Sequence, residues 1–291
     1  MSATRSRLRL QAPAKVNLSL EVTGRRTDGY HEIVSVMQTV GLYDDLVIER
    51  SRGIELASSD PTIDTPDNLV LRAARLLQHA AGIELGCSLR LYKRIPVAAG
   101  VGGGSSDAAA TLIGLNELWS LGWPAERLAG LGAALGSDVP FFVYGGTAVV
   151  RGRGEIVEPL PAGASIWYTL VNPGVQVPTA RIFSALSSDA WTNGAQTREV
   201  AKRIGSAGVF VLGPNGLQDA LFSLYPVVKT CFDRLSNLAP GRTFVSGSGP
   251  TIVVASKTSD GAAEIQSQVR GEGWRSTIAP SVHQVCGAAG T

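Results

Sequence analysis

A glycine-rich segment in the first half of the chain has the composition of a phosphate-binding loop. It runs from Pro96 to Ala110, and four glycines stand directly before a helix-forming stretch: Gly100, Gly102, Gly103 and Gly104. Glycine tolerates positive φ and lets a ligand approach the backbone closely. The unpaired amides and positive dipole end of the following helix favour an anion. We therefore expect the amides of residues 99–106 to hold a polyphosphate, with the hydroxyls of Ser105 and Ser106 beside it.

Two familiar phosphate-binding patterns do not fit this segment. A Walker loop ends in Gly-Lys-Ser/Thr, whereas Gly104 is followed by two serines and Asp107. A dinucleotide fingerprint that starts at Gly100 requires glycine at position 105, which is serine. A flexible or helix-capping glycine loop without a ligand is the alternative. The small and apolar residues around the glycines favour phosphate binding over it.

Composition limits the classes of protein to which the chain can belong. Its 291 residues suggest two lobes or one large α/β unit. Apolar residues make up 44% and charged residues 17%, which excludes a disordered chain. No apolar run approaches the roughly 18 residues that a membrane-spanning helix needs, so we expect no membrane partner. A net charge of +2 gives no argument for nucleic acid.

Cysteine and histidine residues show no metal-binding pattern. The three cysteines and three histidines are widely separated: Cys87, Cys231, Cys286, His31, His79 and His283. This spacing indicates reduced, mostly buried thiols and no dedicated metal site. His79 falls in a predicted helix and is expected to be structural. The sequence begins without the apolar core of a signal peptide, so we expect a cytoplasmic protein.

The polar residues near the start of the chain lie on a predicted strand. From Arg7 to Val22 the pattern alternates with a period of two, which predicts a half-buried strand with Lys15 and Asn17 pointing the same way. After a polar loop at 24–29, two further strands are predicted at 33–40 and 45–49.

The remaining pattern predicts an α+β fold with antiparallel features. Asp67 is expected to cap a helix that includes Leu69 and Ala80. Further helices are predicted after the glycine loop, from Pro124 to about Leu135, and as one amphipathic helix that includes Leu217 and Phe232. The other predicted strands are 88–93, 141–150, 166–171 and the two that flank a glycine turn at 246–249. A Gly- and Pro-rich stretch at 152–163 suggests a boundary between lobes 1–157 and 158–291.

Three ordered motifs resemble those of the GHMP kinase superfamily: PAKVNLSLEV at 13–22, GVGGGSSDAAA at 100–110 and SGSGPT at 246–251. Four more segments are similar to the branch that phosphorylates a cytidyl diphosphate sugar alcohol: GRRTDGYHEI at 24–33, DNLVLRAA at 67–74, LGSDVPFFV at 135–143 and PGVQVPTARIF at 173–183. The resemblance covers nearly the whole chain. It implies the two-lobed GHMP kinase fold, with an N-terminal lobe like ribosomal protein S5 domain 2, a ferredoxin-like C-terminal lobe and the active site between them.

The same resemblance implies an activity. This is ATP-dependent phosphorylation of the 2-hydroxyl of 4-diphosphocytidyl-2-C-methyl-D-erythritol, which yields the 2-phosphate and ADP in the non-mevalonate (methylerythritol phosphate) route to isoprenoid precursors. ATP with Mg²⁺ is the expected cofactor, the partners are small-molecule substrates, and the chain is expected to be a monomer or homodimer. The alternatives are a homoserine- or mevalonate-type kinase, an inactive nucleotide-binding regulator and a purely structural protein.

Phosphoryl transfer requires placement of an alcohol and a γ-phosphate, together with positive charge where negative charge spreads. By similarity, Asp138 orients the substrate hydroxyl and accepts its proton, and Lys15 keeps that carboxylate ionised. An unpaired carboxylate beside the apolar Phe141 and Phe142 would be expensive to bury, which also calls for a cation. The alternatives are a turn cap for Asp138 and an exposed strand lysine for Lys15.

The binding residues implied by the resemblance fall into two groups. The nucleotide group is Asn68 and Leu69 near the adenine, with Pro96, Val97, Ala98, Ala99, Gly100, Val101, Gly102, Gly103, Gly104, Ser105 and Ser106 around the phosphates. At the cytidine end, Tyr30 and Phe183 would sandwich the pyrimidine and His31 would hydrogen-bond its edge. Asn17, Val177 and Thr179 would complete that pocket.

Three parts of the chain leave the sequence interpretation open. Ala98 and Ala99 occupy positions where such loops often have glycine or a larger apolar residue. Asp107 is a conceivable magnesium ligand, but an acidic residue in the first turn of a helix is the simpler interpretation. Residues 187–212 match the superfamily least, and Trp191 either lies near the cleft or belongs to a surface excursion.

Overall fold

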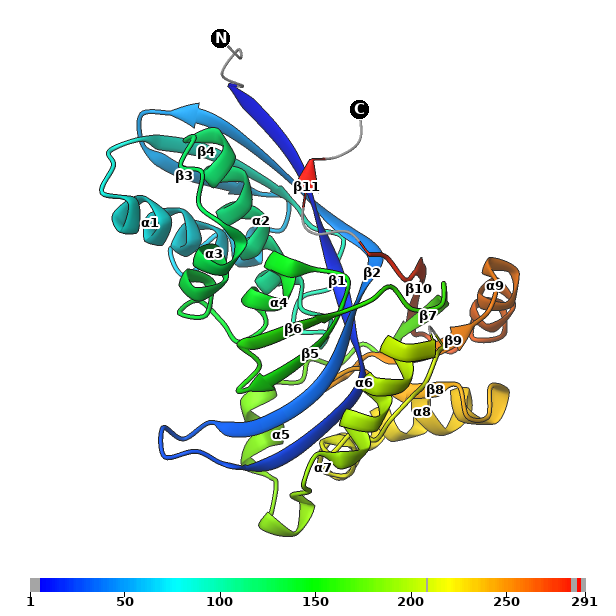
Figure 1. Ribbon diagram of the computed structural model, residues 1–291. Helices are drawn as coiled ribbons and strands as arrows, with labels where there is room; N and C mark the ends of the chain where they lie inside the picture. Colours follow the sequence, from blue (N-terminus) through cyan, green and yellow to red (C-terminus); the bar gives the residue numbers. More distant parts are fainter. Residues whose placement is uncertain (1–5, 208, 284–286, 289–291) are drawn as a thin grey trace.

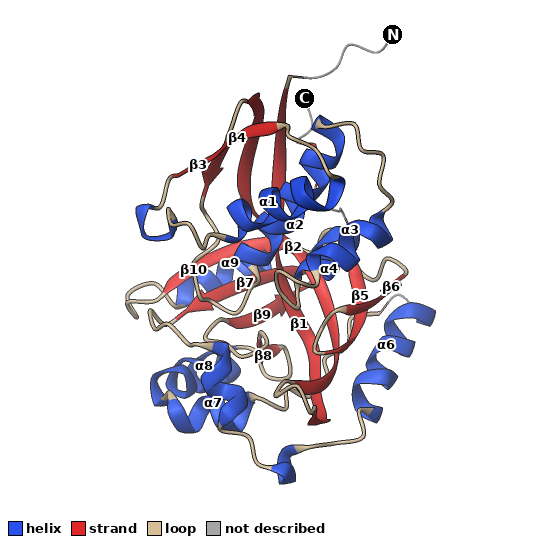
Figure 2. Cartoon of the chain, turned by 90° about the vertical axis from the view of Figure 1, so that its left-hand side faces the viewer, coloured by secondary structure: helices blue, strands red, loops and turns tan. Residues whose placement is uncertain are grey.

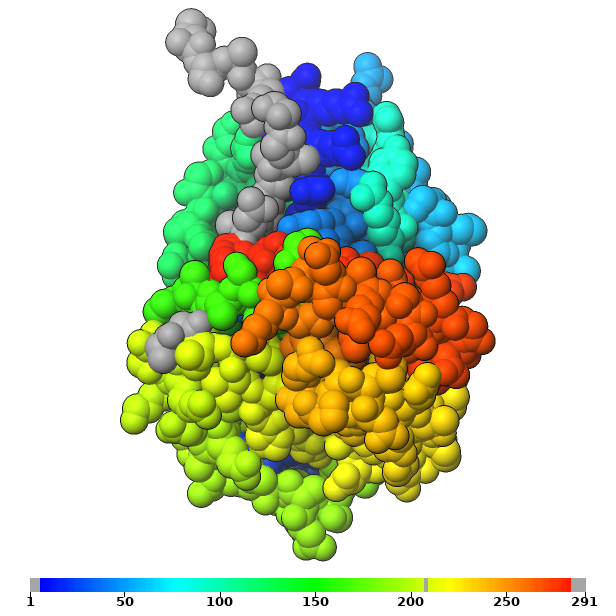
Figure 3. Space-filling view, turned by 90° about the vertical axis from the view of Figure 1, so that its right-hand side faces the viewer, coloured from blue at the N-terminus to red at the C-terminus, as the bar shows by residue number. Residues whose placement is uncertain are grey.

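The computed structural model describes residues 6–207, 209–283 and 287–288, which form a seven-stranded sheet and a four-stranded sheet with helices packed against them (Figure 1). The larger sheet contains β1–β6 and the short strand β11 (Gly287–Ala288). The smaller sheet contains β7–β10. In Figure 3 the residues coloured yellow to red form the lower part of the visible surface, and those of the N-terminal half form the upper part.

A long antiparallel hairpin runs through the length of the molecule (Figure 1). Its strands are β1 (Arg7–Arg25) and β2 (His31–Ser51), paired from Arg7 with Glu49 to Arg25 with His31. The alternation of apolar residues correctly predicts β1. β2 is one continuous strand and not the two that the sequence suggested, because its pairing with β1 continues across a register shift.

Residues 12–22 of β1 are buried on both faces, so the prediction of a half-buried strand holds only for residues 7–11, where exposed and buried side chains alternate. Lys15, Asn17, Ser19 and Glu21 are each 5% exposed or less. The C-terminal half of the chain covers this polar face: Thr197 of α6 (Ala195–Ala207) bonds to both Ser19 and Glu21. The opposite apolar residues pack with the smaller sheet, where Val16 and Tyr168 share one core.

The rest of the larger sheet and its helices complete the N-terminal half. The strands are β3 (Ile54–Ser58), β4 (Gly86–Tyr92), β5 (Thr147–Gly152) and β6 (Ile156–Leu160), in the order β11-β1-β2-β4-β3 with β5 and β6 joined to β2. Helices α1 (Leu69–Ala81), α2 (Gly103–Leu118), α3 (Ala125–Gly132) and α4 (Val139–Tyr144) lie together on one side of it (Figure 2). Their apolar residues form the largest core cluster with the upper part of the hairpin.

The smaller sheet has the ferredoxin-like order expected for the C-terminal lobe. Its strands are β7 (Trp167–Asn172), β8 (Thr243–Val245), β9 (Ile252–Ser256) and β10 (Arg275–Pro280), arranged β10-β7-β9-β8 with all pairs antiparallel. Between β7 and β8 lie α5 (Thr179–Ser184), α6, α7 (Gln218–Leu224) and α8 (Pro226–Leu238), and α9 (Ser259–Gln268) joins β9 to β10. The fold is therefore the α+β, two-lobed arrangement that the resemblance implied. The division at residue 157 stays a prediction.

Four local predictions are wrong. Residues 141–144 belong to helix α4, whose first turn contains Pro140, and only the later part of the predicted strand is present as β5. The predicted helix through Leu217 and Phe232 is two helices, because Pro226 begins α8. Asn68, and not Asp67, caps α1 by accepting a hydrogen bond from Val70 N. Pro124 is the residue before α3 and not its first residue.

The expectation of free, buried cysteines is confirmed at the two positions that the structure describes. Cys87 and Cys231 are free and buried, and burial raises the pKa of each thiol to about 12. Cys286 lies outside the described residues. His79 lies in the last turn of α1. Across the described part of the chain, every helix is too short or too polar to cross a bilayer.

Candidate active site

The glycine loop ends in a helix terminus that is open to an anion. α2 begins at Gly103, and its N-cap, Gly102, has φ of 76° and no side chain with which to cap the helix. A Cβ at Gly102 would lie 2.8 Å from the Phe142 ring and 3.0 Å from Lys15 Cγ. Only glycine therefore fits here, and the first amides of α2 face outward for a phosphate. Ala98 has φ of 55°, in the left-handed region that favours glycine.

The two glycine turns of the chain are in direct contact. A Cβ at Gly100 would lie 2.4 Å from the carbonyl oxygen of Gly249, so the two backbones meet without side chains between them. Ser246 Oγ donates to Gly100 O at 3.1 Å, and Thr251 Oγ1 donates to Ala99 O at 2.7 Å. The second turn therefore supports the phosphate loop from the C-terminal half of the chain.

Lys15 is fixed by contacts along its whole length. Its backbone N donates to Val101 O at 2.9 Å, which ties β1 to the glycine loop. Its Nζ donates to Asn17 Oδ1 at 2.6 Å, and Asn17 Nδ2 in turn donates to Ser35 Oγ at 2.9 Å. A Cβ at Gly247 would lie 3.4 Å from Lys15 Nζ, so the second glycine turn packs over the ammonium group.

Lys15 and Asp138 form the ion pair that the sequence analysis expected. Lys15 Nζ lies 3.5 Å from Asp138 Oδ2, and the two side chains are 6% and 27% exposed. Asp138 occupies the N-cap position of α4, but its carboxylate makes no capping hydrogen bond. Lys15 is therefore not an exposed strand lysine, and Asp138 is not a turn cap. The carboxylate is partly open and its partner ammonium is buried, an arrangement in which a hydroxyl can reach a charged base.

A cavity of about 1240 Å³ brings together most of the predicted site residues. The predicted residues that line it are Lys15, Asn17, Tyr30, His31, Asn68, Leu69, Pro96, Val97, Ala98, Ala99, Gly100, Gly102, Gly103, Gly104, Ser105, Asp138, Thr179 and Phe183. Gly247 and Ser248 of the second glycine turn also line it, and Thr179 Oγ1 lies 2.9 Å from Ser248 Oγ.

Three predicted residues do not line the cavity. Val177 is buried in the C-terminal core because its neighbours there are apolar, among them Ile182 and Leu221. Val101 points into the core shared by the two sheets, and only its backbone carbonyl contributes, to Lys15. Ser106 is fully buried, and its backbone N already donates to Gly102 O within α2.

Aromatic residues also line the cavity, among them Tyr30, His31 and Phe183. His31 and Phe183 have ring centroids 5.2 Å apart, so the hairpin and α5 meet there. Tyr30 is 51% exposed, so it does not belong to the hydrophobic core. Arg153 Cζ lies 5.0 Å from the centre of the Tyr30 ring. Burial, together with the charge of Arg25, lowers the pKa of His31 below its usual 6.5, which favours the neutral imidazole.

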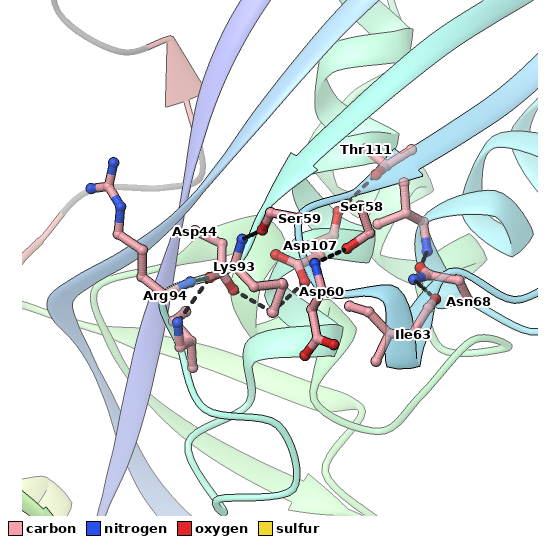
Figure 4. Close-up of polar contacts among 12 residues, drawn as sticks. Asp44, Ser58, Ser59, Asp60, Ile63, Asn68, Lys93, Arg94, Asp107 and Thr111 are labelled. Carbon is pink, nitrogen blue, oxygen red and sulfur yellow. Dashed lines mark hydrogen bonds and ion pairs between the residues drawn. The ribbon is translucent and has the colours of Figure 1, made fainter. Parts of the chain in front are cut away.

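A buried cluster of three charges lies behind the glycine loop (Figure 4). Lys93 Nζ is paired with Asp44 Oδ2, and it lies 2.7 Å from Asp107 Oδ2. Asp44 Oδ1 also accepts hydrogen bonds from the backbone N of Arg94 and of Ile95. Asp107 Oδ1 is buried and has no hydrogen-bond partner among the described residues. Two carboxylates therefore share one ammonium, and Asp107 is the less well satisfied.

The acid–base properties of this cluster follow from that imbalance. Burial and the nearby charge of Asp44 raise the pKa of Asp107 to about 7, against the opposing effect of Lys93. Burial lowers the pKa of Lys93, but the two carboxylates outweigh it and the net shift is upward. Asp107 belongs to the second turn of α2, so its interpretation as a first-turn acid is wrong. It lines the cavity together with Lys93.

The sequence analysis did not identify three cationic residues that line the cavity, which are Lys93, Arg25 and Arg153. Lys93 directly follows β4 and precedes the loop, and Arg153 lies in the turn after β5. Sequence position alone gave no signal, because each side chain reaches the cavity through tertiary packing. Lys15 and Lys93 are paired with carboxylates, so a substrate with several phosphates would meet the charges of Arg25 and Arg153 in this cavity. Among the residues the structure describes, no three His, Cys, Asp or Glu side chains gather as a metal cluster.

Comparison with known proteins agrees with this geometry. The model for the GHMP kinases N terminal domain matches residues 68–146, and that for the GHMP kinases C terminal matches residues 197–275. A protein from Heliobacterium modesticaldum named 4-diphosphocytidyl-2-C-methyl-D-erythritol kinase is 42% identical over 270 residues, 84% of this chain and 85% of the relative. A relative of the same name from Bacillus cytotoxicus is 41% identical, over 84% of this chain and 87% of its own.

Solved structures show the same relationship. The crystal structure of a 4-(cytidine 5'-diphospho)-2C-methyl-D-erythritol kinase superposes with a TM-score of 0.81 and 34% identity, covering 94% of this chain and 99% of that one. A homoserine kinase from Cytophaga hutchinsonii, at 19% identity and a TM-score of 0.70, shares the fold over 98% of this chain and 97% of its own. Two family models match the chain in order, and relatives above 40% identity match most of its length. The chain therefore belongs to the GHMP kinases, in the branch of the 4-diphosphocytidyl-2-C-methyl-D-erythritol kinases.

Proposed function

We propose that this protein transfers the γ-phosphoryl group of ATP to the 2-hydroxyl of 4-diphosphocytidyl-2-C-methyl-D-erythritol, a step of the non-mevalonate isoprenoid pathway. The observation that carries the proposal is the Lys15–Asp138 pair, 3.5 Å apart, in a cavity lined by both an anion-binding glycine loop and an aromatic group. The names of the relatives and of the solved structure support this substrate over homoserine or mevalonate.

The chemistry follows from the placement of the two charged groups. Asp138 accepts the proton of the 2-hydroxyl as its oxygen attacks the γ-phosphorus, and the bond from that phosphorus to the β–γ bridging oxygen breaks to release ADP. Lys15 Nζ, held by Asn17, pairs with the Asp138 carboxylate and stabilises negative charge on the alkoxide and the transferred phosphoryl group. An inactive regulator would have no need for this pair.

The nucleotide would lie along the glycine loop. Backbone amides at the start of α2 would hold the phosphates, and the cavity walls formed by Asn68, Leu69 and Val97 would receive the base. Mg²⁺ is proposed to arrive as the ATP complex and to neutralise charge between the β- and γ-phosphates. Ser105 and Asp138 are cavity-lining residues with oxygen atoms that could hold it.

The other end of the cavity would receive the cytidine. Tyr30 and Phe183 offer aromatic faces, and a neutral His31 offers one donor and one acceptor for the edge of an aminopyrimidine. Arg25 and Arg153 are close enough to this end to neutralise the diphosphate of the substrate. A cytoplasmic location and a monomeric or homodimeric state are part of the proposal.

Phosphorus-31 detection of product tests the proposal. The purified protein is incubated with Mg-ATP and, in separate reactions, with the cytidyl substrate, homoserine or mevalonate. A phosphomonoester signal is expected with the cytidyl substrate alone. Phosphorylation of homoserine or mevalonate instead would identify a different GHMP kinase, and ATP binding without turnover of any alcohol would identify a regulator.

Two variants assign the catalytic role. Asp138→Asn keeps the size of the side chain and is expected to lower kcat by about 10²- to 10⁴-fold. Asp233→Asn on the exposed surface of α8, where Asp233 pairs only with Lys229, is the matched control and should retain the parent rate. An unchanged rate in Asp138→Asn would remove this residue from its assigned role.

A further inference from the structure

The segment between α5 and α6, residues 185–194, is here called the strap, and it passes along the lower end of the molecule in Figure 1. Most of it belongs to residues 187–212, the stretch that matches the superfamily motifs least. Three of its residues nevertheless line the cavity: Leu186, Ser188 and Trp191. The strap thus extends the wall that α5 begins with Phe183. The alternative that Trp191 is part of a surface excursion away from the cleft is wrong.

Trp191 offers an unused aromatic surface at this wall. It is 38% exposed, although large apolar side chains are usually buried where packing allows. No other aromatic ring of the described structure packs against its indole, whereas His31 and Phe183 pack against each other nearby. An exposed indole in the lining of a cavity is suited to contact a flat or apolar part of a ligand.

The strap is not free to move away, because a buried carboxylate of β1 holds it. Glu21 is 1% exposed. Its Oε1 accepts a hydrogen bond from Thr192 Oγ1 at 2.7 Å, and its Oε2 accepts one from Thr197 N at 2.6 Å. Thr192 N also donates to Val22 O at 2.9 Å. The residue after Trp191 is thereby attached to β1 through both its backbone and its side chain.

The charge of Glu21 suits this attachment. Burial raises the pKa of Glu21, but the hydrogen bonds from Thr192 and Thr197 and the charge of Arg198 outweigh it, so the pKa lies below its usual value. The carboxylate also faces the first turn of α6, where the helix dipole favours a negative charge. Glu21 therefore stays ionised at neutral pH and keeps its two hydrogen bonds.

We infer that Trp191 is a further substrate-binding residue, which packs against the nucleoside end of the cytidyl substrate, and that Glu21 is the positioning residue that holds it there. The inference rests on the proposed function, since it takes the substrate from it. Thr192, the residue after Trp191, donates to Val22 O, and Val22 pairs with Ile33, two residues after His31. Trp191 therefore lines the cavity near the His31–Phe183 contact and adds a wall to that pocket. Substitution of Trp191 should therefore weaken binding of the cytidyl substrate and leave the rate of phosphoryl transfer, which occurs at Asp138, unchanged.

Binding of CDP and steady-state kinetics together test the inference. CDP carries the nucleoside and diphosphate of the substrate but no acceptor alcohol, and it is titrated with ADP saturating the nucleotide site. Trp191→Ala is expected to raise the Kd for CDP and the KM for the cytidyl substrate about 5- to 100-fold, the range for loss of one base–aromatic contact. The kcat and the KM for ATP should stay within about threefold of the parent. Trp191→Phe, which keeps a ring, should recover most of the affinity.

Glu21 is tested by a double-mutant cycle. Glu21→Gln should raise the KM for the cytidyl substrate with kcat unchanged, and adding it to Trp191→Ala should cause little further change, because the two residues act through one contact. Tyr92→Ala is the control for an exposed aromatic residue outside the cavity, since Tyr92 is 46% exposed and is not among the lining residues.

The outcomes separate the inference from the proposed function. If the parent protein binds CDP and Trp191→Ala binds it equally well, the inference is overturned and the proposed function stands. Additive effects of Glu21→Gln and Trp191→Ala would overturn the role given to Glu21. A parent protein that neither binds CDP nor phosphorylates the cytidyl substrate would overturn both proposals.

Discussion

Asp107 is predicted to make the stability of the protein depend on pH, and Asp107→Asn is predicted to remove that dependence. The carboxyl group is 2% exposed, it shares Lys93 with Asp44, and one of its oxygens has no partner in the described structure. Asparagine has nearly the same shape but no charge. The exchange therefore removes the burial penalty of a carboxylate and leaves the packing of α2 in place.

The magnitude follows from the pKa of the group. Burial raises the pKa of Asp107 from its usual 3.8 to about 7. Each pKa unit corresponds to about 1.36 kcal/mol, so ionising Asp107 costs the folded state about 4 kcal/mol more than the unfolded state. The folded chain holds the proton more tightly, so this contribution to stability is fully present below about pH 4 and is lost as the pH rises to about 7. Between pH 5 and pH 8 the loss is about 2 to 3 kcal/mol.

Urea unfolding at pH 5, 6.5 and 8 measures this contribution. The quantity to compare is the difference in the free energy of unfolding between Asp107→Asn and the parent, because other titrating groups cancel in it. The variant should gain about 2 to 3 kcal/mol relative to the parent from pH 5 to pH 8. Asp233→Asn, at an exposed position on α8, should show no such gain. A constant difference between Asp107→Asn and the parent across this range would refute the argument that the carboxyl group is protonated at low pH because it is buried.

Three further predictions concern the cavity. Gly102→Ala should lower ATP affinity and destabilise the fold by about 1 to 3 kcal/mol, because its φ is 76° and the new Cβ would meet the Phe142 ring. Gly130→Ala in α3, where the new Cβ would have nothing within 4 Å, should do neither in the same titration and urea melt. Lys15→Met should lower kcat by about 10²-fold or more in the coupled ADP assay, and a loss confined to KM would contradict its role at Asp138. The KM for the cytidyl substrate should be constant above pH 7 and should rise at acidic pH, because His31 takes up a proton there. If His31→Gln shows the same pH profile, His31 is not the group whose protonation raises the KM.

Features that depend on local backbone chemistry could be predicted from the sequence. The glycine loop and the second glycine turn were identified because positive φ and close backbone contact leave few alternatives to glycine, as at Gly100 and Gly102. The strand that carries Lys15 was identified because a period of two is a strong signal. Its burial on both faces was not, since polar residues at every second position are also what a solvent-facing strand would have.

Other features depended on information that is not local. The run from Phe141 to Tyr144 is apolar throughout, and a short apolar run fits a buried strand as well as a buried helix. The helical period continues across Pro226, which hides the break between α7 and α8. Asp44, Lys93 and Asp107 come from three separate parts of the chain, so only their packing reveals that they form one cluster. Trp191 is held at the cavity by hydrogen bonds between β1 and the strap, and the spacing of residues in the sequence does not predict these bonds.

The contact of Gly100 with Gly249 means that the nucleotide cradle is assembled from two distant pieces of chain. Thr251 and Ser246, from the C-terminal half of the chain, donate hydrogen bonds to carbonyl groups of the loop. A fragment that ends before the smaller sheet would contain every residue of the phosphate loop but would lack this backing. Recovery of ATP binding on mixing the two fragments would thus report reassembly of the protein directly, without any assay of turnover.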